Sequence, residues 1–179
     1  MFRNFYPEVY YRSVYEIDFK KYYDEGRRAI LFDIDNTLVM HDAPANDQAK
    51  ALVDELSGIG FRMCVVSNNK GQRVSSFADA VGISYVCSAG KPGTKGYERA
   101  MELLGTEHKE TMAVGDQLFT DMWGANRAGL FSVLVKPIGS DPTIKIKLKR
   151  IGEKIVFIFY RKYVKKHPYR QYIKQLMQS

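Results

Sequence analysis

The sequence AILFDIDNT at residues 29–37 decides the fold of this chain. Its first four residues are apolar and uncharged, which is typical of a β-strand buried on both faces of a sheet. Two carboxylates, an amide and a hydroxyl follow within the next five positions. The stretch therefore predicts a buried central strand whose carboxyl end carries a polar site.

Further apolar runs follow along the chain and alternate with stretches of helical periodicity. The runs are residues 63–66, 85–87, 112–114 and 131–135, and the helical stretches are residues 52–59, 74–81, 94–104 and a segment reaching about residue 128. Strands separated by helices favour parallel pairing with right-handed crossovers. We predict a doubly wound α/β fold with a parallel sheet of about five strands.

The chain has 179 residues and a mass of 20.5 kDa, which is room for one domain with a short appendage. We divide it into an aromatic lead-in (1–28), the α/β core (29–137) and a basic tail (138–179). Two cysteines exclude a disulfide framework and a four-cysteine zinc site. The longest uncharged apolar run, residues 155–160, is too short to span a membrane, and the first residues do not resemble a secretory signal.

Polar clusters follow four of the predicted strands. They lie at residues 33–37, 67–69, 91–92 and 115–121. Because crossover helices return the chain to the opposite edge each time, all four clusters fall at the carboxyl edge of the sheet. The sequence therefore predicts one site that collects carboxylates, a hydroxyl and a lysine.

These residue types suit hydrolysis of a phosphate ester through an aspartyl-phosphate. Asp33 is the predicted nucleophile, and Asp35 is the acid that protonates the leaving oxygen and then activates water. Ser67, Asn68 and Lys91 are expected to bind the phosphate, with the lysine neutralising charge. Close carboxylates repel one another without a cation, so the cluster predicts a Mg²⁺ site. Its expected ligands are Asp33, Asp35, Asp116 and Asp121.

These motifs resemble those of the haloacid dehalogenase (HAD) superfamily. Its phosphatases carry Asp-x-Asp-x-Thr, then Ser or Thr, then Lys, then Gly-Asp-x(3,4)-Asp. The matching residues here are Asp33, Asp35, Thr37, Ser67, Lys91, Asp116 and Asp121. The resemblance implies a catalytic part for Thr37, and the second aspartate argues for phosphate-ester hydrolysis rather than dehalogenation. Lys95 lies close to Lys91, so the sequence leaves open which lysine serves.

The chain is more closely similar to the YqeG-like phosphatases, relatives of the mitochondrial-type phosphatidylglycerophosphate phosphatases. The shared stretches are FDIDNTLV (32–39), VSNN (66–69), GDQLFTD (115–121) and GANRAGL (124–130). The gaps of 34 residues from Asp33 to Ser67 and 24 from Ser67 to Lys91 leave no room for a cap domain. We therefore expect a capless member (subfamily IIIA) with an open site, which suits a large substrate or needs a covering subunit.

Charge is distributed unevenly along the chain. Residues 143–179 hold 11 Lys and Arg against one acid, Glu153, or +10, whereas the remainder has 16 bases and 19 acids, or −3. An apolar stripe runs through the tail at Ile144, Leu148, Ile151, Ile155 and Ile158, and a second at Tyr169, Tyr172, Ile173 and Leu176. Basic amphipathic helices with aromatic residues bind anionic lipid surfaces.

The resemblance and the tail together favour a Mg²⁺-dependent phosphatase acting on phosphatidylglycerophosphate in phospholipid biosynthesis. We expect a cytoplasmic protein attached peripherally to the inner face of the membrane. Three alternatives stay open: a soluble nucleotide, sugar phosphate or phosphoprotein as substrate; a tail that packs on the domain or across an oligomer interface; and a non-catalytic adaptor for RNA or membranes.

Overall fold

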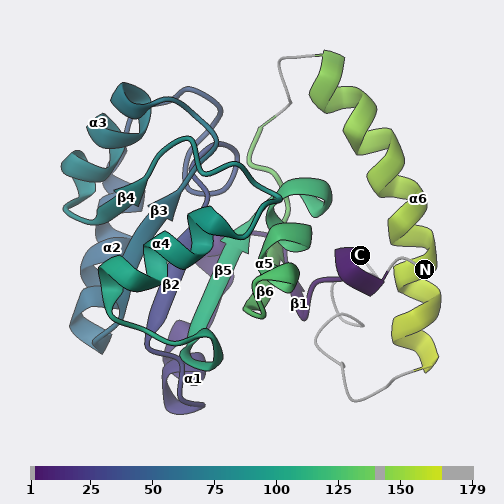
Figure 1. Ribbon diagram of the computed structural model, residues 1–179, viewed down its shortest axis with the longest axis horizontal. Coiled ribbons are helices and arrows are strands. Elements are labelled where there is room, and N and C mark those ends of the chain that lie inside the picture. The colour runs from purple at the N-terminus through teal and green to yellow at the C-terminus, as the bar shows by residue number, and fades with distance from the viewer. Residues whose placement is uncertain (1–2, 140–143, 167–179) are drawn as a thin grey trace.

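A computed structural model describes residues 3–139 and 144–166, and a parallel sheet of six strands forms its centre. The strands lie in the order β1-β6-β5-β2-β3-β4, so β2 is internal and is flanked by β5 and β3 (Figure 1). Their bounds are β1 Val9–Tyr11, β2 Ala29–Phe32, β3 Arg62–Val66, β4 Ser84–Val86, β5 Thr111–Gly115 and β6 Phe131–Val135.

Helices cover both faces of this sheet. They are α1 (Phe19–Asp24), α2 (Asp47–Ile59), α3 (Gly71–Val81), α4 (Lys95–Leu104), α5 (Trp123–Arg127) and α6 (Ile144–Lys166), with 3₁₀ turns η1 (Arg3–Phe5), η2 (Val14–Glu16) and η3 (His108–Glu110) and a π-helical turn η4 (Leu118–Met122). Within residues 33–83, the connections between β2, β3 and β4 hold only α2 and α3. The predicted doubly wound fold without a cap domain is confirmed.

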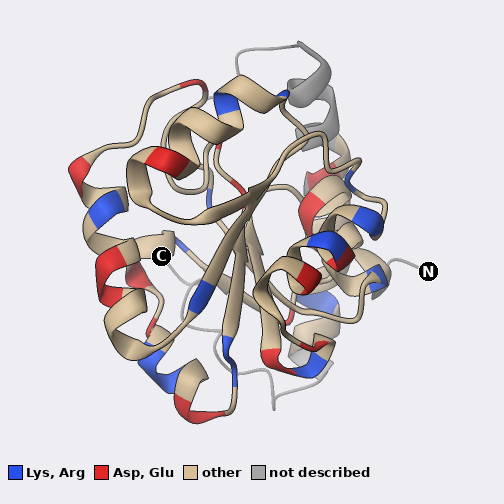
Figure 2. Cartoon of the chain, turned by 60° about the vertical axis from the view of Figure 1, so that its left-hand side comes forward, with Lys and Arg blue, Asp and Glu red and all other residues tan. Residues whose placement is uncertain are grey.

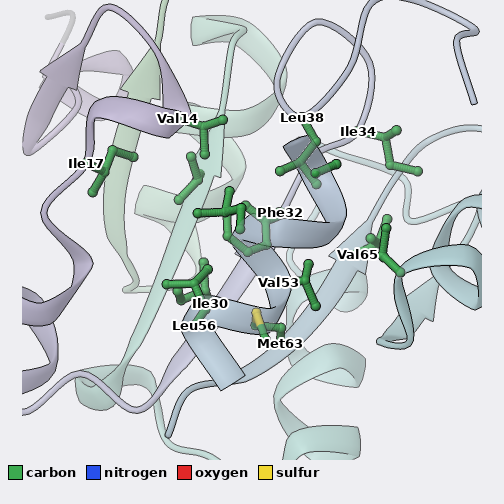
Figure 3. Close-up of a cluster of buried hydrophobic side chains, with 14 of the residues drawn as sticks. Val14, Ile17, Ile30, Phe32, Ile34, Leu38, Val53, Leu56, Met63 and Val65 are labelled. Atoms are coloured by element: carbon green, nitrogen blue, oxygen red, sulfur yellow. The ribbon is translucent and has the colours of Figure 1, made fainter. Parts of the chain in front are cut away.

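Alternate residues of each strand enter two different apolar clusters. Ile30, Phe32 and Val65 belong to the cluster that also holds residues of α1, α2 and α3, and Figure 3 shows Ile30 near Leu56 of α2. Leu31 and Cys64 belong to the cluster that holds residues of α4 and α5. Such strands are buried on both faces, which is why the runs read as continuously apolar. This packing fixes the carboxyl ends of β2, β3 and β5, where the polar clusters begin.

The sixth strand, β1, differs from the five that the sequence predicts. It comes from the aromatic lead-in and pairs in parallel with the edge of β6, with Val9 opposite Val133. The three half-buried residues of β1 give too short a pattern to be recognised as a strand from the sequence. Val14 and Ile17 of the lead-in belong to the same buried cluster as Ile30 and Phe32 (Figure 3). The lead-in is therefore part of the α/β unit.

Helix α6 lies against the side of the domain, next to the N-terminal residues (Figure 1). Its inner face packs Val156, Tyr160 and Val164 onto Tyr6 and η4, and the Tyr160 hydroxyl donates to the carbonyl of Pro7 at 3.0 Å. Glu153 is buried, and its carboxylate accepts a hydrogen bond from the Leu118 N–H at 2.8 Å. Helix α6, the part of the tail that the structure describes, thus packs on the domain, one of the alternatives that the sequence leaves open.

The predicted apolar stripe of the tail is not the face that packs. Ile155 and Ile158 are exposed, at 51% and 56%. The side chains of Ile144, Leu148 and Ile151, and the whole second stripe at residues 169–176, lie outside the described part of the chain. Within the described ranges, no helix combines the length and hydropathy of a membrane-spanning segment.

Candidate active site

The predicted site residues gather at the carboxyl ends of three neighbouring strands. The Asp33 N–H donates to the carbonyl of Val114 at 2.9 Å, and the Ser67 N–H donates to that of Val86 at 3.0 Å. These bonds continue the pairing of the sheet by one residue beyond the strands. The backbones of Asp33 and Ser67 are therefore held by the sheet itself, and their side chains enter a pocket above it.

The buried ammonium of Lys91 joins two of the predicted carboxylates. Its Nζ lies 2.6 Å from Asp33 Oδ1 and 2.6 Å from Asp121 Oδ1. Burial alone lowers the pKa of Lys91, but the carboxylates of Asp121 and Asp33 outweigh it and raise that pKa well above its ordinary value. Lys91 is therefore a permanent positive charge between the two acids.

The side chain of Asn68 fixes the backbone of Lys91. Its Oδ1 accepts the Lys91 N–H at 2.7 Å, and its Nδ2 donates to the Lys91 carbonyl at 3.0 Å. Asn68 also lines the pocket, where substrate binding remains its predicted role. Lys95, the alternative lysine, is exposed at the start of α4. The structure therefore places Lys91, and not Lys95, among the carboxylates.

Asp121 reaches the site because of the turn that carries it. The π-helical turn η4 brings its side chain back over β5, where its Oδ2 accepts the Gln117 N–H at 3.0 Å. A Cβ on Gly115 would lie 2.5 Å from the Asp121 Cγ, so only glycine leaves room for this carboxylate. Single π turns of this kind occur frequently at functional sites.

Three carboxylates form a group with the chemistry of a divalent-cation site. Oxygens of Asp33, Asp116 and Asp121 lie within 4.8 Å of one another, and Asp116 and Asp121 are buried. With Lys91 the group carries a net charge of −2 when all three acids are ionised. Buried oxygen ligands with excess negative charge fit a hard cation such as Mg²⁺.

The electrostatics of Asp33 reflect this crowding. Burial raises the pKa of its carboxyl to about 7; Lys91 opposes the rise, and Asp121 and Asp35 add to it. A group that has to be ionised to attack phosphorus is therefore half protonated near neutral pH in the protein alone. A divalent cation beside it would favour the charged form.

Asp35 occupies the other side of the pocket and lies apart from the group of three carboxylates. Its Oδ1 accepts from Arg73 Nη2 at 3.0 Å and from the Asp42 N–H at 2.9 Å, and its Oδ2 accepts from Asn69 Nδ2 at 2.5 Å. These donors orient the carboxylate over the pocket. Ligand atoms of Asp35, His41 and Asp42 form a second group within 4.8 Å of one another, and metal binding by Asp35 stays a prediction.

The remaining predicted residues, Ser67 and Thr37, differ in whether they line the pocket. Ser67 lines the pocket, and its Oγ accepts the Asn69 N–H at 3.2 Å. Thr37 belongs to the same loop as Asp33, is fully buried and is not among the residues that line the pocket. The structure thus brings Asp33, Asp35, Ser67 and Lys91 together around one open space.

Comparison with known proteins agrees with this geometry. The family model for haloacid dehalogenase-like hydrolases matches residues 41–129. The probable phosphatase YqeG of Bacillus subtilis is 31% identical over 151 residues, which are 84% of this chain and 88% of that protein. The chain belongs to the haloacid dehalogenase-like hydrolase family. It is a phosphatase of phosphoric monoesters.

Two further proteins are similar to this chain. The chloroplastic and mitochondrial phosphatidylglycerophosphate phosphatase 1 of Arabidopsis thaliana is 24% identical over 177 residues, covering 89% of this chain but 49% of that protein. A HAD phosphatase from Thermococcus onnurineus superposes with a TM-score of 0.51 at 15% identity, over 65% of this chain and 90% of that one. At this identity the match to the HAD phosphatase shows the fold alone.

The sequence did not indicate three further residues of this HAD-type site. Arg73, in the first turn of α3, pairs with Asp35, and His41 lines the pocket. Glu153 of α6 holds the turn that carries Asp121. A weak signal existed for Arg73, which lies six residues after Ser67 at a helix start that faces the site.

Proposed function

We propose that this protein is a Mg²⁺-dependent phosphomonoesterase that hydrolyses phosphatidylglycerophosphate at a membrane surface. The observation that carries the catalytic part is the contact of Lys91 with both Asp33 and Asp121, beside Asp116, in an open pocket. A lysine between two acids, one of them poised for attack, is the arrangement that phosphoryl transfer needs.

Each residue of the pocket has a defined task in this reaction. An oxygen of Asp33 attacks phosphorus, and the bond between phosphorus and the ester oxygen breaks. Asp35 gives its proton to the leaving alkoxide, so that an alcohol departs and Asp33 carries the phosphoryl group. Asp35 then takes a proton from water, whose oxygen attacks the same phosphorus, and inorganic phosphate and free Asp33 result.

Lys91 and Ser67 support both steps. The ammonium of Lys91 lies within hydrogen-bonding distance of Asp33 and offsets charge on the phosphoryl group, and the Ser67 hydroxyl binds one of its oxygens. Asp33, Asp116 and Asp121 would hold Mg²⁺, which neutralises phosphate charge when bound. Asn69 and Arg73 keep Asp35 on the side of the pocket where the leaving group departs.

Binding of Mg²⁺ should raise the melting temperature of the protein. A ligand that binds only the folded state stabilises it by about 2.7 kcal/mol at a hundred times its Kd. We expect Asp116→Asn to abolish this increase, because one of the three carboxylates is lost, and Asp54→Asn, an exposed acid on α2, to preserve it. Thermal melts in EDTA and in Mg²⁺ measure the effect. Equal melting temperatures of the wild type in both would contradict the metal site.

The proposed substrate rests on three observations. The relative from Arabidopsis thaliana is named a phosphatidylglycerophosphate phosphatase. The connections that hold α2 and α3 leave the pocket without a cap, which suits a phosphate carried on a large molecule. Finally, α6 carries nine Lys and Arg against one acid, which suits an anionic lipid surface.

A direct assay tests the proposed substrate. Release of inorganic phosphate from phosphatidylglycerophosphate in mixed micelles should exceed release from a panel of soluble nucleotides, sugar phosphates and a phosphopeptide in kcat/KM. The Asp33→Asn variant provides the background rate. Preferential hydrolysis of a soluble ester would assign the enzyme to that substrate, and no hydrolysis of any ester would favour the adaptor function.

A further inference from the structure

The outward surface of α6 combines exposed apolar and basic side chains. Ile155, Ile158 and Phe159 are 51%, 56% and 45% exposed, and Arg161 and Lys162 beside them are also exposed. The described residues hold seven exposed large apolar side chains, and three of them fall within these five positions. We call this set, residues 155, 158, 159, 161 and 162, the outer face of α6.

The outer face has a fixed orientation because the opposite side of the helix is anchored. Ile155, Ile158, Phe159 and Lys162 recur at i, i+3, i+4 and i+7 and so share one side. Val156, Tyr160 and Val164 are buried on the other side, against Tyr6 and η4. The helix therefore lies along the domain and presents its apolar and basic residues outward.

Charge distinguishes this helix from the rest of the protein. The helices that face the viewer in Figure 2 carry both signs of charge side by side. Helix α6 has nine bases and a single acid, Glu153, and that acid is turned inward onto the Leu118 N–H. The described side chains of the outer face include two cations and no anion, so the complementary partner is anionic and has an apolar layer.

We infer that the outer face of α6 is a membrane-docking surface that binds an anionic lipid bilayer. Ile155, Ile158 and Phe159 enter the boundary between headgroups and acyl chains, and Arg161 and Lys162 contact lipid phosphates. The inference rests on the proposed function only in that a lipid substrate gives the enzyme a reason to bind bilayers. The docking residues themselves lie outside the catalytic pocket.

The helix is also close enough to the site to bring it to the lipid. A Cβ on Gly152 would lie 3.0 Å from the ring of Phe119, so α6 approaches η4 closely at this position. Glu153 accepts a hydrogen bond from the N–H of Leu118, which precedes Phe119 at the start of that turn. The outer face lies on the opposite side of α6 from this turn, so a bilayer bound there is separated from η4 by the width of one helix, about 10 Å.

Vesicle binding tests this inference with matched controls. The probes are sedimenting vesicles of phosphatidylcholine alone and of phosphatidylcholine mixed with phosphatidylglycerol, which has no phosphomonoester for the active site. We expect the full chain to bind the anionic vesicles and to dissociate as salt is added. Ile158→Ser with Phe159→Ser should weaken binding roughly tenfold or more. Arg161→Gln with Lys162→Gln should weaken it to a similar extent, roughly tenfold.

The control variants remove exposed apolar or basic side chains from parts of the protein other than α6. Leu103→Ser removes an exposed apolar side chain from α4, and Arg99→Gln with Lys109→Gln removes two exposed cations. Both variants should bind the vesicles as the wild type does. All variants should hydrolyse a soluble phosphate ester normally. Full binding by Ile158→Ser with Phe159→Ser overturns the inference. So does a wild-type dimer that this variant converts to monomer, since the face then belongs to a second copy.

The two proposals fail in different ways. If the protein binds vesicles through these residues but does not hydrolyse phosphatidylglycerophosphate, the docking surface is supported and the proposed substrate is wrong. If the protein hydrolyses phosphatidylglycerophosphate in micelles but does not bind anionic vesicles, the proposed substrate is supported and the docking surface is wrong.

Discussion

The Asp33→Asn variant is expected to lose phosphatase turnover by roughly 10³-fold or more, as other enzymes do without their nucleophile. The amide cannot attack phosphorus to form the covalent intermediate. It has the same shape as the carboxylate, so the fold is retained. Phosphate release from a soluble ester in Mg²⁺ measures the effect, with Asp54→Asn on the exposed face of α2 as the matched control.

The same variant should also be more stable than the wild type when no metal is present. Burial raises the pKa of Asp33 to about 7, above the usual 3.8 of an unfolded chain, so the folded protein binds this proton more tightly. Between these two values the stability contributed by Asp33 falls as pH rises. Thermal melts in EDTA should show that the melting temperature of the wild type falls from pH 6 to pH 8, and that Asp33→Asn makes this fall smaller.

Full activity of a folded Asp33→Asn variant would exclude Asp33 as the nucleophile.

Lys91→Met should cause the second large effect, a loss of both activity and stability. The substitution leaves Asp33 and Asp121 buried without the cation that both contact. Breaking a buried ion pair from one side costs about 3–5 kcal/mol. Activity should fall because charge on the phosphoryl group is no longer offset. Urea unfolding in EDTA and turnover in Mg²⁺ measure the two losses.

Lys95→Met is the matched control, since Lys95 is exposed and four residues away. It should retain activity and stability. If Lys91→Met does not fold, the stability of the Asp33→Asn/Lys91→Met double variant is measured instead. Removal of one acid should restore part of the stability, so the two effects should not add. Loss of activity in Lys95→Met with normal Lys91→Met would reverse the choice of lysine.

The sequence allowed prediction of the features that depend on short-range pattern. Continuous apolar runs reveal strands buried on both faces, and the residue after each run must lie at the carboxyl edge. That reasoning was enough to bring Asp33, Ser67 and Lys91 to one pocket, as the structure has them. The same reasoning did not decide between Lys91 and Lys95, because the two lysines lie only four residues apart.

Features that depend on tertiary distance could not be predicted. Arg73 meets Asp35 across 38 positions of sequence, and Glu153 meets Leu118 across 35. No periodicity within either segment encodes such a meeting. Strand β1 could not be predicted for the same reason, because its three residues form a strand only by pairing with β6. The stripe in the tail was recognised, but which side of α6 packs depended on the surface offered by Tyr6 and η4.

The hydrogen bond from the Leu118 N–H to Glu153 has a thermodynamic consequence. It connects the helix that we infer to meet the bilayer with the turn that carries Asp121. Any coupling through such a contact is reciprocal: if docking stabilises the turn and so strengthens metal binding, metal binding strengthens docking by the same factor. The enzyme would then be most active at the membrane that holds its substrate. The ratio of the vesicle affinities measured with and without Mg²⁺ gives the coupling factor.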